Sequence, residues 1–268
     1  MASEPIPQGP SGGISREKLR VAWIVEGTIR FYREHLVSIL TVFIIANLLT
    51  WTVQYYSAAR VDALFERYDI NLSDFVNSPE EIYAEALPLL TDLLLLAVLA
   101  AISVFMINLL FQAMTIKYVR EHLLGAQTTW VESLFQILPR FPVLVGATIV
   151  TGLIITLGMI ALVLPGLVLA IMFILVPQVV ILENRGPISS LSRSSSLTSG
   201  NKWTIFFFFA FLFVVLLLFT MIMAQLGPSI WADAIQLIVG TIFTPVIPIS
   251  MTLVYHRISS DPRVSPIS

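Results

Sequence analysis

The chain has 268 residues, of which 57% are apolar and only 12% are charged, and its net charge is −2. A soluble domain of this length carries roughly twice that charged fraction. A net charge so close to zero predicts no basic surface for nucleic acid. The sequence has no cysteine, which excludes a disulfide framework, a thiolate metal site and a cysteine nucleophile. The composition indicates an integral membrane protein.

Apolar residues gather into runs of about 20, the length that crosses a hydrocarbon core of roughly 30 Å. We therefore predict an all-α polytopic protein with six transmembrane helices in one domain, residues 16–256. Residues 1–15 are expected to form a disordered tail, because they lack the basic start of a signal peptide and are rich in proline and glycine. Residues 257–268 form a second, short polar tail.

The first part of the domain predicts a surface helix followed by two spans. Residues 16–35 combine charged side chains on one side with Trp23 and Tyr32, a mixture that suits a helix at the membrane interface. The first span is expected over residues 36–55. The longest polar connection of the chain, residues 56–87, follows it.

This connection contains two helix signals. Apolar residues at helical spacing predict a short, separate amphipathic helix over residues 61–68. Ser78, followed by Pro79 and two glutamates, predicts the start of a long helix, since a capping residue there precedes proline at the first helical position. That helix is expected to kink near Pro88 and to continue as the second span.

The second part of the domain repeats this order. Residues Thr129–Glu132 form a capping box that starts a surface helix, expected over residues 129–138. Two spans follow it, over residues 142–164 and 167–182. The Pro165-Gly166 pair between them predicts a tight turn with almost no loop.

The third part follows the same order again. A third surface helix is expected over residues 187–199, where a Gly-Pro pair opens it and a glycine ends it. The last two spans are expected over residues 203–226 and 230–255. Pro245 and Pro248 should bend the sixth span, which membranes tolerate when neighbouring groups satisfy the freed carbonyls.

The basic residues predict an orientation. With the N-terminus inside, all but two of the 15 Lys and Arg residues fall on the inner side, and only Arg60 and Arg67 fall outside. Basic loops stay cytoplasmic, so both termini are expected in the cytoplasm, with the protein in the plasma membrane. The acidic connection over residues 56–87 is then outside, where Asn71 matches a glycosylation acceptor.

The order of elements suggests three consecutive units, each a surface helix followed by a hairpin of two spans. The surface helices are those expected over residues 16–35, 129–138 and 187–199. Superposition of the three hairpins in the same chain direction would support this hypothesis.

The stretch from residue 165 to residue 203 carries a specific pattern of prolines, glycines and polar residues: Pro165, Gly166, Pro177, Glu183, Gly186, Arg193, Ser194, Gly200 and Trp203. It resembles the family of six-helix membrane proteins named after the membrane domain found beside some glycerophosphoryl diester phosphodiesterases. The resemblance implies the six-helix fold, with this pattern as a structural motif. It implies no hydrolysis, because in the fused members catalysis belongs to a separate soluble barrel domain, for which this sequence leaves no room.

Glu183 and Arg193 are the best candidates for a polar pair. Glu183 lies at the predicted inner end of the fourth span, and a salt bridge to Arg193 would fix the third surface helix against the bundle. The alternative is a lipid-headgroup site, in which Arg185, Arg193 and Lys202 offer cationic contacts to phosphate.

Polar residues within the spans are few, which argues against a proton relay. The candidates to line a cavity between the hairpins are Asn108, Gln112, Gln178 and Glu183. The serines of the third surface helix are expected to form a solvated face. No cofactor is predicted, and no metal site either, because the histidines lack nearby carboxylates at ligand spacing: His35, His122 and His256.

These observations favour a non-catalytic protein that organises membrane or serves as an accessory subunit, in contact with membrane lipids and with a protein partner or a second copy. The alternative is a transporter or lipid-handling protein with a cavity between the hairpins. An intramembrane enzyme has the least support, since the sequence has no HExxH or GxSxG motif and no paired intramembrane aspartates. A dry, closely packed interior would favour the first of these functions.

Overall fold

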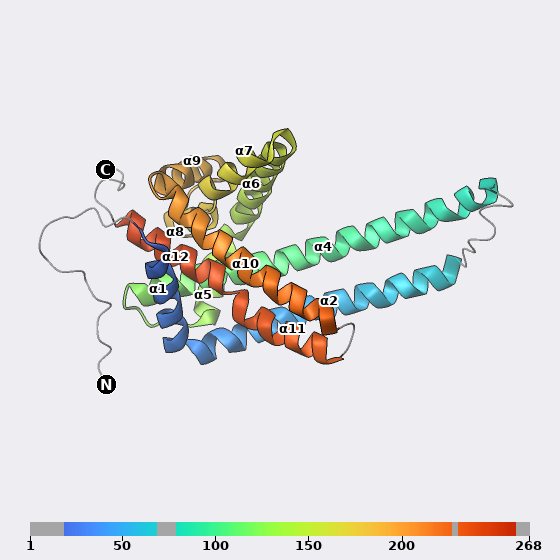
Figure 1. The fold of residues 1–268 in the computed structure, drawn as a ribbon, viewed down its shortest axis with the longest axis horizontal. Helices are drawn as coiled ribbons and strands as arrows, with labels where there is room; N and C mark the ends of the chain where they lie inside the picture. The colour runs from blue at the N-terminus through green and yellow to red at the C-terminus, as the bar shows by residue number, and fades with distance from the viewer. Residues whose placement is uncertain (1–18, 69–78, 227–229, 261–268) are drawn as a thin grey trace, which may run out of the picture.

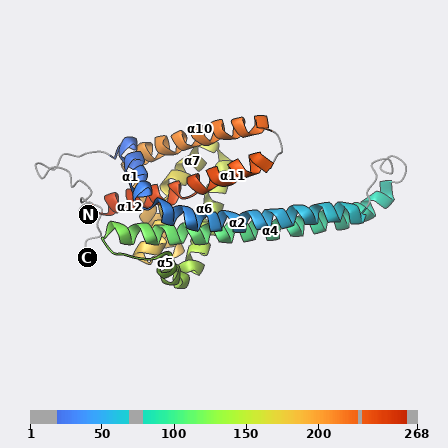
Figure 2. The same ribbon diagram turned by 90° about the horizontal axis from the view of Figure 1, so that it is seen from below.

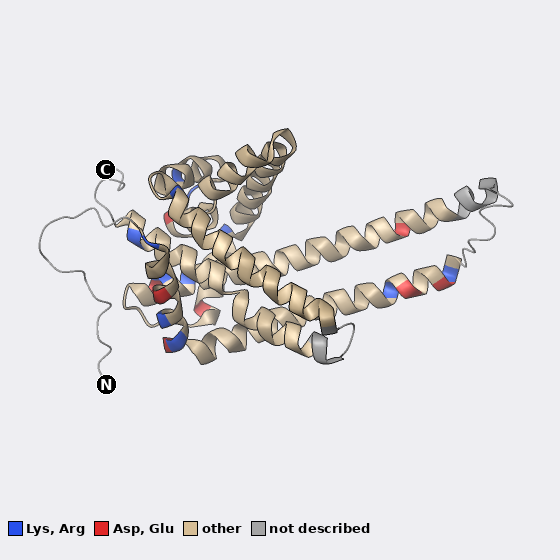
Figure 3. Cartoon of the chain, viewed as in Figure 1, with Lys and Arg blue, Asp and Glu red and all other residues tan. Residues whose placement is uncertain are grey.

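The computed structural model describes residues 19–68, 79–226 and 230–260, and every regular element within those ranges is a helix (Figure 1). Six helical segments are long and apolar enough to cross a membrane. Charged side chains gather at one end of the molecule and near the tip of one long hairpin, while most of the helical length between carries none (Figure 3). The chain is an all-α polytopic membrane protein, as its composition predicts.

The first unit has the predicted order of elements but longer helices. It consists of α1 (Val21–Glu34), α2 (Leu36–Tyr68) and α4 (Pro79–Leu123). The start at Pro79 is confirmed. The separate amphipathic helix predicted over residues 61–68 is wrong, because α2 continues through it without a break and so keeps its backbone hydrogen bonds. The predicted cap at Ser78 and the acceptor Asn71 lie outside the described residues.

α2 and α4 form the longest part of the molecule. With 33 and 45 residues, they measure about 50 Å and about 68 Å, against a hydrocarbon core of about 30 Å. They lie side by side and extend past the ends of the other helices (Figures 1 and 2). A hydrogen bond of 2.9 Å from Tyr68 Oη to Asp92 Oδ2 joins them in this extended part.

The second unit contains α5 (Trp130–Ile137), the 3₁₀ helix η1 (Leu138–Arg140), α6 (Phe141–Ala161), α7 (Val163–Met172) and α8 (Val176–Glu183). The predicted capping box is confirmed. Thr129 Oγ1 accepts a hydrogen bond from the backbone N–H of Glu132, and the Glu132 carboxylate accepts one from the N–H of Thr129. The fourth span is broken between α7 and α8, where residues 173–175 form a turn.

The turn that precedes the fourth span lies at Leu162, so the turn predicted at Pro165 and Gly166 is wrong. Leu162 is extended (φ −163°, ψ 137°), whereas the Pro-Gly pair lies in the first turn of α7. Proline fits there because first-turn N–H groups have no partner within a helix. A Cβ built on Gly166 would lie 2.5 Å from Cγ of Met159, so this glycine lets α6 and α7 pack closely.

The third unit contains α9 (Pro187–Thr198), α10 (Lys202–Leu226), α11 (Ile230–Phe243) and α12 (Val246–Ser259). Gly200 follows α9 with φ +88°, the left-handed conformation that ends many helices. The bend predicted at Pro245 is confirmed and is a full break, because Thr244 and Pro245 form a turn between α11 and α12. Pro248 is accommodated within the first turn of α12.

The three units contact one another in cyclic order. The surface helix of each unit packs against the second span of the unit before it: α5 against α4, α9 against α8 and, closing the circle, α1 against α12. The three second spans also contact one another, α4 with α8, α8 with α12 and α12 with α4. This repetition of contacts supports the three-unit hypothesis.

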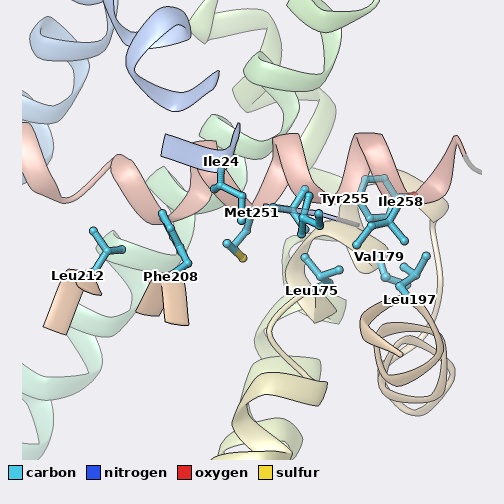
Figure 4. Packing of buried hydrophobic residues seen from close by; sticks show 11 residues of the cluster. Ile24, Leu175, Val179, Leu197, Phe208, Leu212, Met251, Tyr255 and Ile258 are labelled. Atoms are coloured by element: carbon cyan, nitrogen blue, oxygen red, sulfur yellow. The ribbon is translucent and has the colours of Figure 1, made fainter. Parts of the chain in front are cut away.

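α12 lies at the centre of the core. Residues 248–255 along it are all buried, which shows that neighbours surround this helix on every side. One hydrophobic cluster joins Met251 and Tyr255 of α12 to Ile24 of α1 and Phe208 of α10 (Figure 4). We call the charged end of the molecule, where α1 and the C-terminal ends of α4 and α12 meet, the basic end (Figures 1 and 3).

Candidate functional site

A polar network centred on Glu183 lies where α8 ends. Glu183 Oε1 accepts hydrogen bonds from Arg193 Nε and from Tyr255 Oη, both at 3.0 Å. Its other oxygen, Oε2, accepts one from Arg185 Nε at 2.7 Å. The side chains of Glu183 and Arg193 are only 17% and 11% exposed, so water screens this ion pair little. The Glu183–Arg193 pair expected from the sequence is present, and two further donors extend it.

This network joins three helices. Glu183 ends α8, Arg193 belongs to α9 and Tyr255 belongs to α12. Asn184 has a left-handed conformation (φ 55°), which turns the chain after Glu183 so that α9 packs beside α8. A carboxylate that already accepts hydrogen bonds from three side chains is poorly placed to take a proton from a substrate. The arrangement is suited to holding helices together.

Hydroxyl groups from α9 form hydrogen bonds with the backbone groups that lack helical partners at the break in the fourth span. Ser194 Oγ donates to the carbonyl oxygen of Met172 at 2.7 Å and accepts from the N–H of Leu175 at 3.2 Å. Thr198 Oγ1 donates to the same carbonyl at 3.4 Å. Backbone groups within a bilayer need such partners, because the hydrocarbon offers no water. α9 therefore stabilises the broken span in addition to covering it.

The expectation of a solvated serine face on α9 is wrong for two of the serines. Ser190 and Ser194 are 0% exposed, whereas Ser192 and Ser196 are exposed. The missed signal was the spacing of four residues from Ser190 through Ser194 to Thr198, which places three hydroxyl groups on one face of a helix. That face is the one packed within the bundle.

At the break in the sixth span, a hydroxyl group from α1 binds a backbone carbonyl in a similar way. Tyr32 Oη donates to the carbonyl oxygen of Ile242, in the last turn of α11, at 2.8 Å. Burial raises the pKa of the Tyr32 phenol, so the group stays protonated as a donor. In both broken spans, a hydroxyl group from the surface helix of the next unit in the cycle thus accompanies the break.

The histidines at the basic end are arranged as two separate contacts. The rings of His35 and His122 are T-shaped with centroids 4.7 Å apart, whereas Nδ1 of His256 accepts a hydrogen bond from Arg120. Burial lowers the pKa of His35; a hydrogen bond to the carbonyl of Phe31 opposes this shift, and the nearby His122 adds to it. Within the described ranges, no group of three or more His, Cys, Asp or Glu side chains could hold a metal ion.

The prediction that Asn108, Gln112, Gln178 and Glu183 line a common cavity is wrong. Asn108 is exposed and donates to the carbonyl oxygen of Val104 in its own helix, at 2.8 Å. Gln178 is 1% exposed and buried in α8. None of the four lines either of the two pockets described below. Polarity alone does not tell which side of a span faces its neighbours, and here Asn108 faces outward.

The three cations proposed for a lipid headgroup do not act as one set. Arg185 and Arg193 both bind Glu183. Lys202 is the first residue of α10, where the structure describes no ion pair for it. Two arginines that already compensate a carboxylate offer less charge to a phosphate than the sequence suggests.

The remaining motif residues of the stretch 165–203 have structural positions. Pro177 lies in the first turn of α8, and Gly186 is the N-cap of α9. Trp203 is 74% exposed at the start of α10, a position typical of aromatic side chains at a membrane interface.

Among the pockets between the described helices are two of about 300 Å³ each. The first is an apolar groove between α1, α10 and the α11–α12 break, and its lining includes Val25, Ile29, Tyr32, Arg33, Phe208 and Ile242. The second is polar and includes Lys117, Arg140 and Asn184. The Lys117 ammonium is already paired with Glu121 at 2.7 Å. The sequence indicated neither pocket, because each combines elements far apart in the chain.

Comparison with known proteins matches residues 19–256 to the uncharacterised protein family UPF0259. No curated protein matches the chain, and no solved structure matches it. Nothing in these comparisons links the chain to the phosphodiesterase-associated family, so the resemblance over residues 165–203 stays a prediction. Because the match extends over most of the sequence, the chain belongs to the family UPF0259.

Proposed function

We propose that this protein is a non-catalytic accessory subunit of a larger assembly in the plasma membrane. The observation that carries the proposal is the α2–α4 hairpin, which extends past the other helices (Figures 1 and 2). Several large apolar and aromatic side chains on this hairpin are 50% to 68% exposed, because no other described part of the chain covers them. These side chains are Trp51, Tyr55, Tyr56, Leu87, Leu90 and Leu94.

The apolar part of the hairpin is longer than a bilayer requires. From Ala86 to Ile116, α4 carries one charged residue, Asp92, and this stretch measures about 46 Å at about 1.5 Å per residue. A hydrocarbon core covers only about 30 Å of it. Tyrosine and tryptophan are enriched in protein interfaces. These features suit a partner membrane protein that lies along α2 and α4.

The rest of the molecule supports a framework role. The core along α12 is buried without interruption over residues 248–255, and Glu183 is bound by three donors. Ser194 and Tyr32 are each used to satisfy the backbone at a break. The transporter alternative has less support, because Asn108 and Gln178 do not share a cavity.

Photo-crosslinking in native membranes tests the proposal. A photoreactive amino acid replaces Leu90 on the hairpin, and a matched control replaces Ile160 of α6, which is 77% exposed. We expect one protein adduct of defined mass from position 90 and none from position 160. An adduct of twice the 29.8 kDa chain would show self-association and overturn the accessory role. Lipid adducts alone at both positions would overturn the docking surface itself.

A further inference from the structure

The apolar groove beside α1 is built from three parts of the chain. α1 contributes Val25 and Ile29, α10 contributes Phe208, and Ile242 and Val246 flank the α11–α12 break. α1 runs across the direction of α2 and α4 at the basic end in both views (Figures 1 and 2). A helix with this orientation and an amphipathic sequence lies at the membrane interface. The groove is therefore placed where lipid headgroups meet acyl chains.

The groove exists because α1 and α9 cover their neighbouring hairpins differently. α9 packs directly on α6, where a Cβ built on Gly146 would lie 3.8 Å from Cγ of Pro187. In the equivalent place, α1 covers the hairpin of α10 and α12 and leaves a space of about 300 Å³. In a bilayer, an open apolar space of this kind is filled by hydrocarbon, since exposing it to water is unfavourable.

The polar edge of the groove selects the occupant. Tyr32 lines the groove, but its hydroxyl group is already bound to Ile242. Arg33 also lines it, is exposed, and makes no ion pair with the described residues. Glu34 is the next residue, but successive helical residues do not face each other. The charge available to a ligand at this edge is therefore positive, and phosphate is the anion that a guanidinium group binds well.

We propose that this groove binds one phospholipid with an anionic headgroup. One acyl chain of this lipid lies between α1 and α10, and the phosphate of its headgroup contacts Arg33. The site goes beyond the proposed accessory role, because it takes only Leu36, the first residue of α2, from the α2–α4 hairpin and needs no partner protein. It also differs from the headgroup contacts predicted at Arg185 and Arg193, which bind Glu183.

Native mass spectrometry of the purified protein tests this site. The protein is incubated with equal amounts of phosphatidylglycerol and phosphatidylcholine of the same acyl composition. We expect the protein to bind one phosphatidylglycerol with about fivefold higher affinity than phosphatidylcholine. A preference of this size corresponds to the contribution of one basic side chain near a membrane surface. Arg33→Gln should bring the ratio close to one, while Ile29→Trp should fill the groove and lower the binding of both lipids.

Two matched variants provide the controls. Arg20→Gln removes an exposed cation from the N-cap of α1, and Val37→Trp adds the same bulk at a residue that is 79% exposed and outside the groove. Both should bind lipid as the unchanged protein does, and circular dichroism checks that every variant keeps its helical content. Equal binding of the two lipids by the unchanged protein, or full binding by Ile29→Trp, would overturn the proposal. Displacement by inorganic phosphate alone would show an anion site without a lipid.

Discussion

Tyr255 of α12 donates a hydrogen bond to Glu183 at the end of α8, with 3.0 Å between Oη and Oε1. The bond joins the sixth span to the end of the fourth, although the two residues are far apart in the sequence. Arg193 binds the same oxygen at 3.0 Å from α9. One carboxylate thus joins three helices, and its removal should weaken the packing of all three.

Glu183→Ala should strongly destabilise the protein. Arg193 is 11% exposed, so the substitution removes a carboxylate from a largely buried cation, a change that costs about 3–5 kcal/mol. Tyr255→Phe removes one hydrogen bond and should cost about 1 kcal/mol. Thermal unfolding in detergent measures both effects. Glu121→Gln is the matched control, since its pair with Lys117 is more exposed and should contribute about 0.5 kcal/mol or less. Equal melting temperatures for Glu183→Ala and Glu121→Gln would contradict the role assigned to the network.

Ser194→Ala should loosen the break in the fourth span. It leaves the carbonyl of Met172 with only the longer bond to Thr198 and the N–H of Leu175 without a partner, at a cost of about 1–3 kcal/mol. Hydrogen exchange should rise at residues 173–175. Ser196→Ala changes an exposed serine of the same helix, so it should neither lower the stability nor raise hydrogen exchange at residues 173–175. A faster exchange in both variants would indicate a general loss of α9 instead.

The order of helices could be predicted because each depends on local signals. The capping box at Thr129 and the proline start at Pro79 act within one turn of helix, and both are present as predicted. The turn at Leu162 could not be predicted, because the function of Gly166 depends on Met159 in the preceding helix. Local signals specify where helices begin, while contacts between helices decide what an ambiguous Pro-Gly pair does.

The candidate site was predictable in part for the same reason. Glu183 and Arg193 lie ten positions apart on either side of one turn, so their pairing followed from the sequence. Tyr255 and Tyr32 reach their partners from other units of the fold. No periodicity in one helix indicates which distant carbonyl or carboxylate a tyrosine will meet.

Acidification should loosen the junction of α1 with α4 through His35. Its pKa is lowered in the folded protein by burial and by the neighbouring His122, while Glu34 and the Phe31 carbonyl favour protonation. In the unfolded chain the imidazole of His35 has a pKa of about 6.5, so the unfolded state binds the proton at a higher pH than the folded state does. The free energy of unfolding therefore falls as the pH drops through and below that value. Melting temperatures at pH 7.5 and pH 5.5 measure the effect. His35→Gln should reduce the difference, and an unchanged difference would assign it to other groups.

Single cysteines can test the orientation, because the natural sequence has none. The basic residues predict that Arg60 lies outside and that Thr128 and Ser260 lie inside. The side chains of Arg60 and Ser260 are exposed and that of Thr128 is partly exposed, so each should react when reagent reaches it. In intact cells, a membrane-impermeant maleimide should label Arg60→Cys and should leave Thr128→Cys and Ser260→Cys unlabelled. Permeabilised cells should show labelling of all three, which controls for reactivity. Labelling of Thr128→Cys in intact cells would reverse the orientation, and with it the prediction that α1, its groove and Arg33 face the anionic inner leaflet.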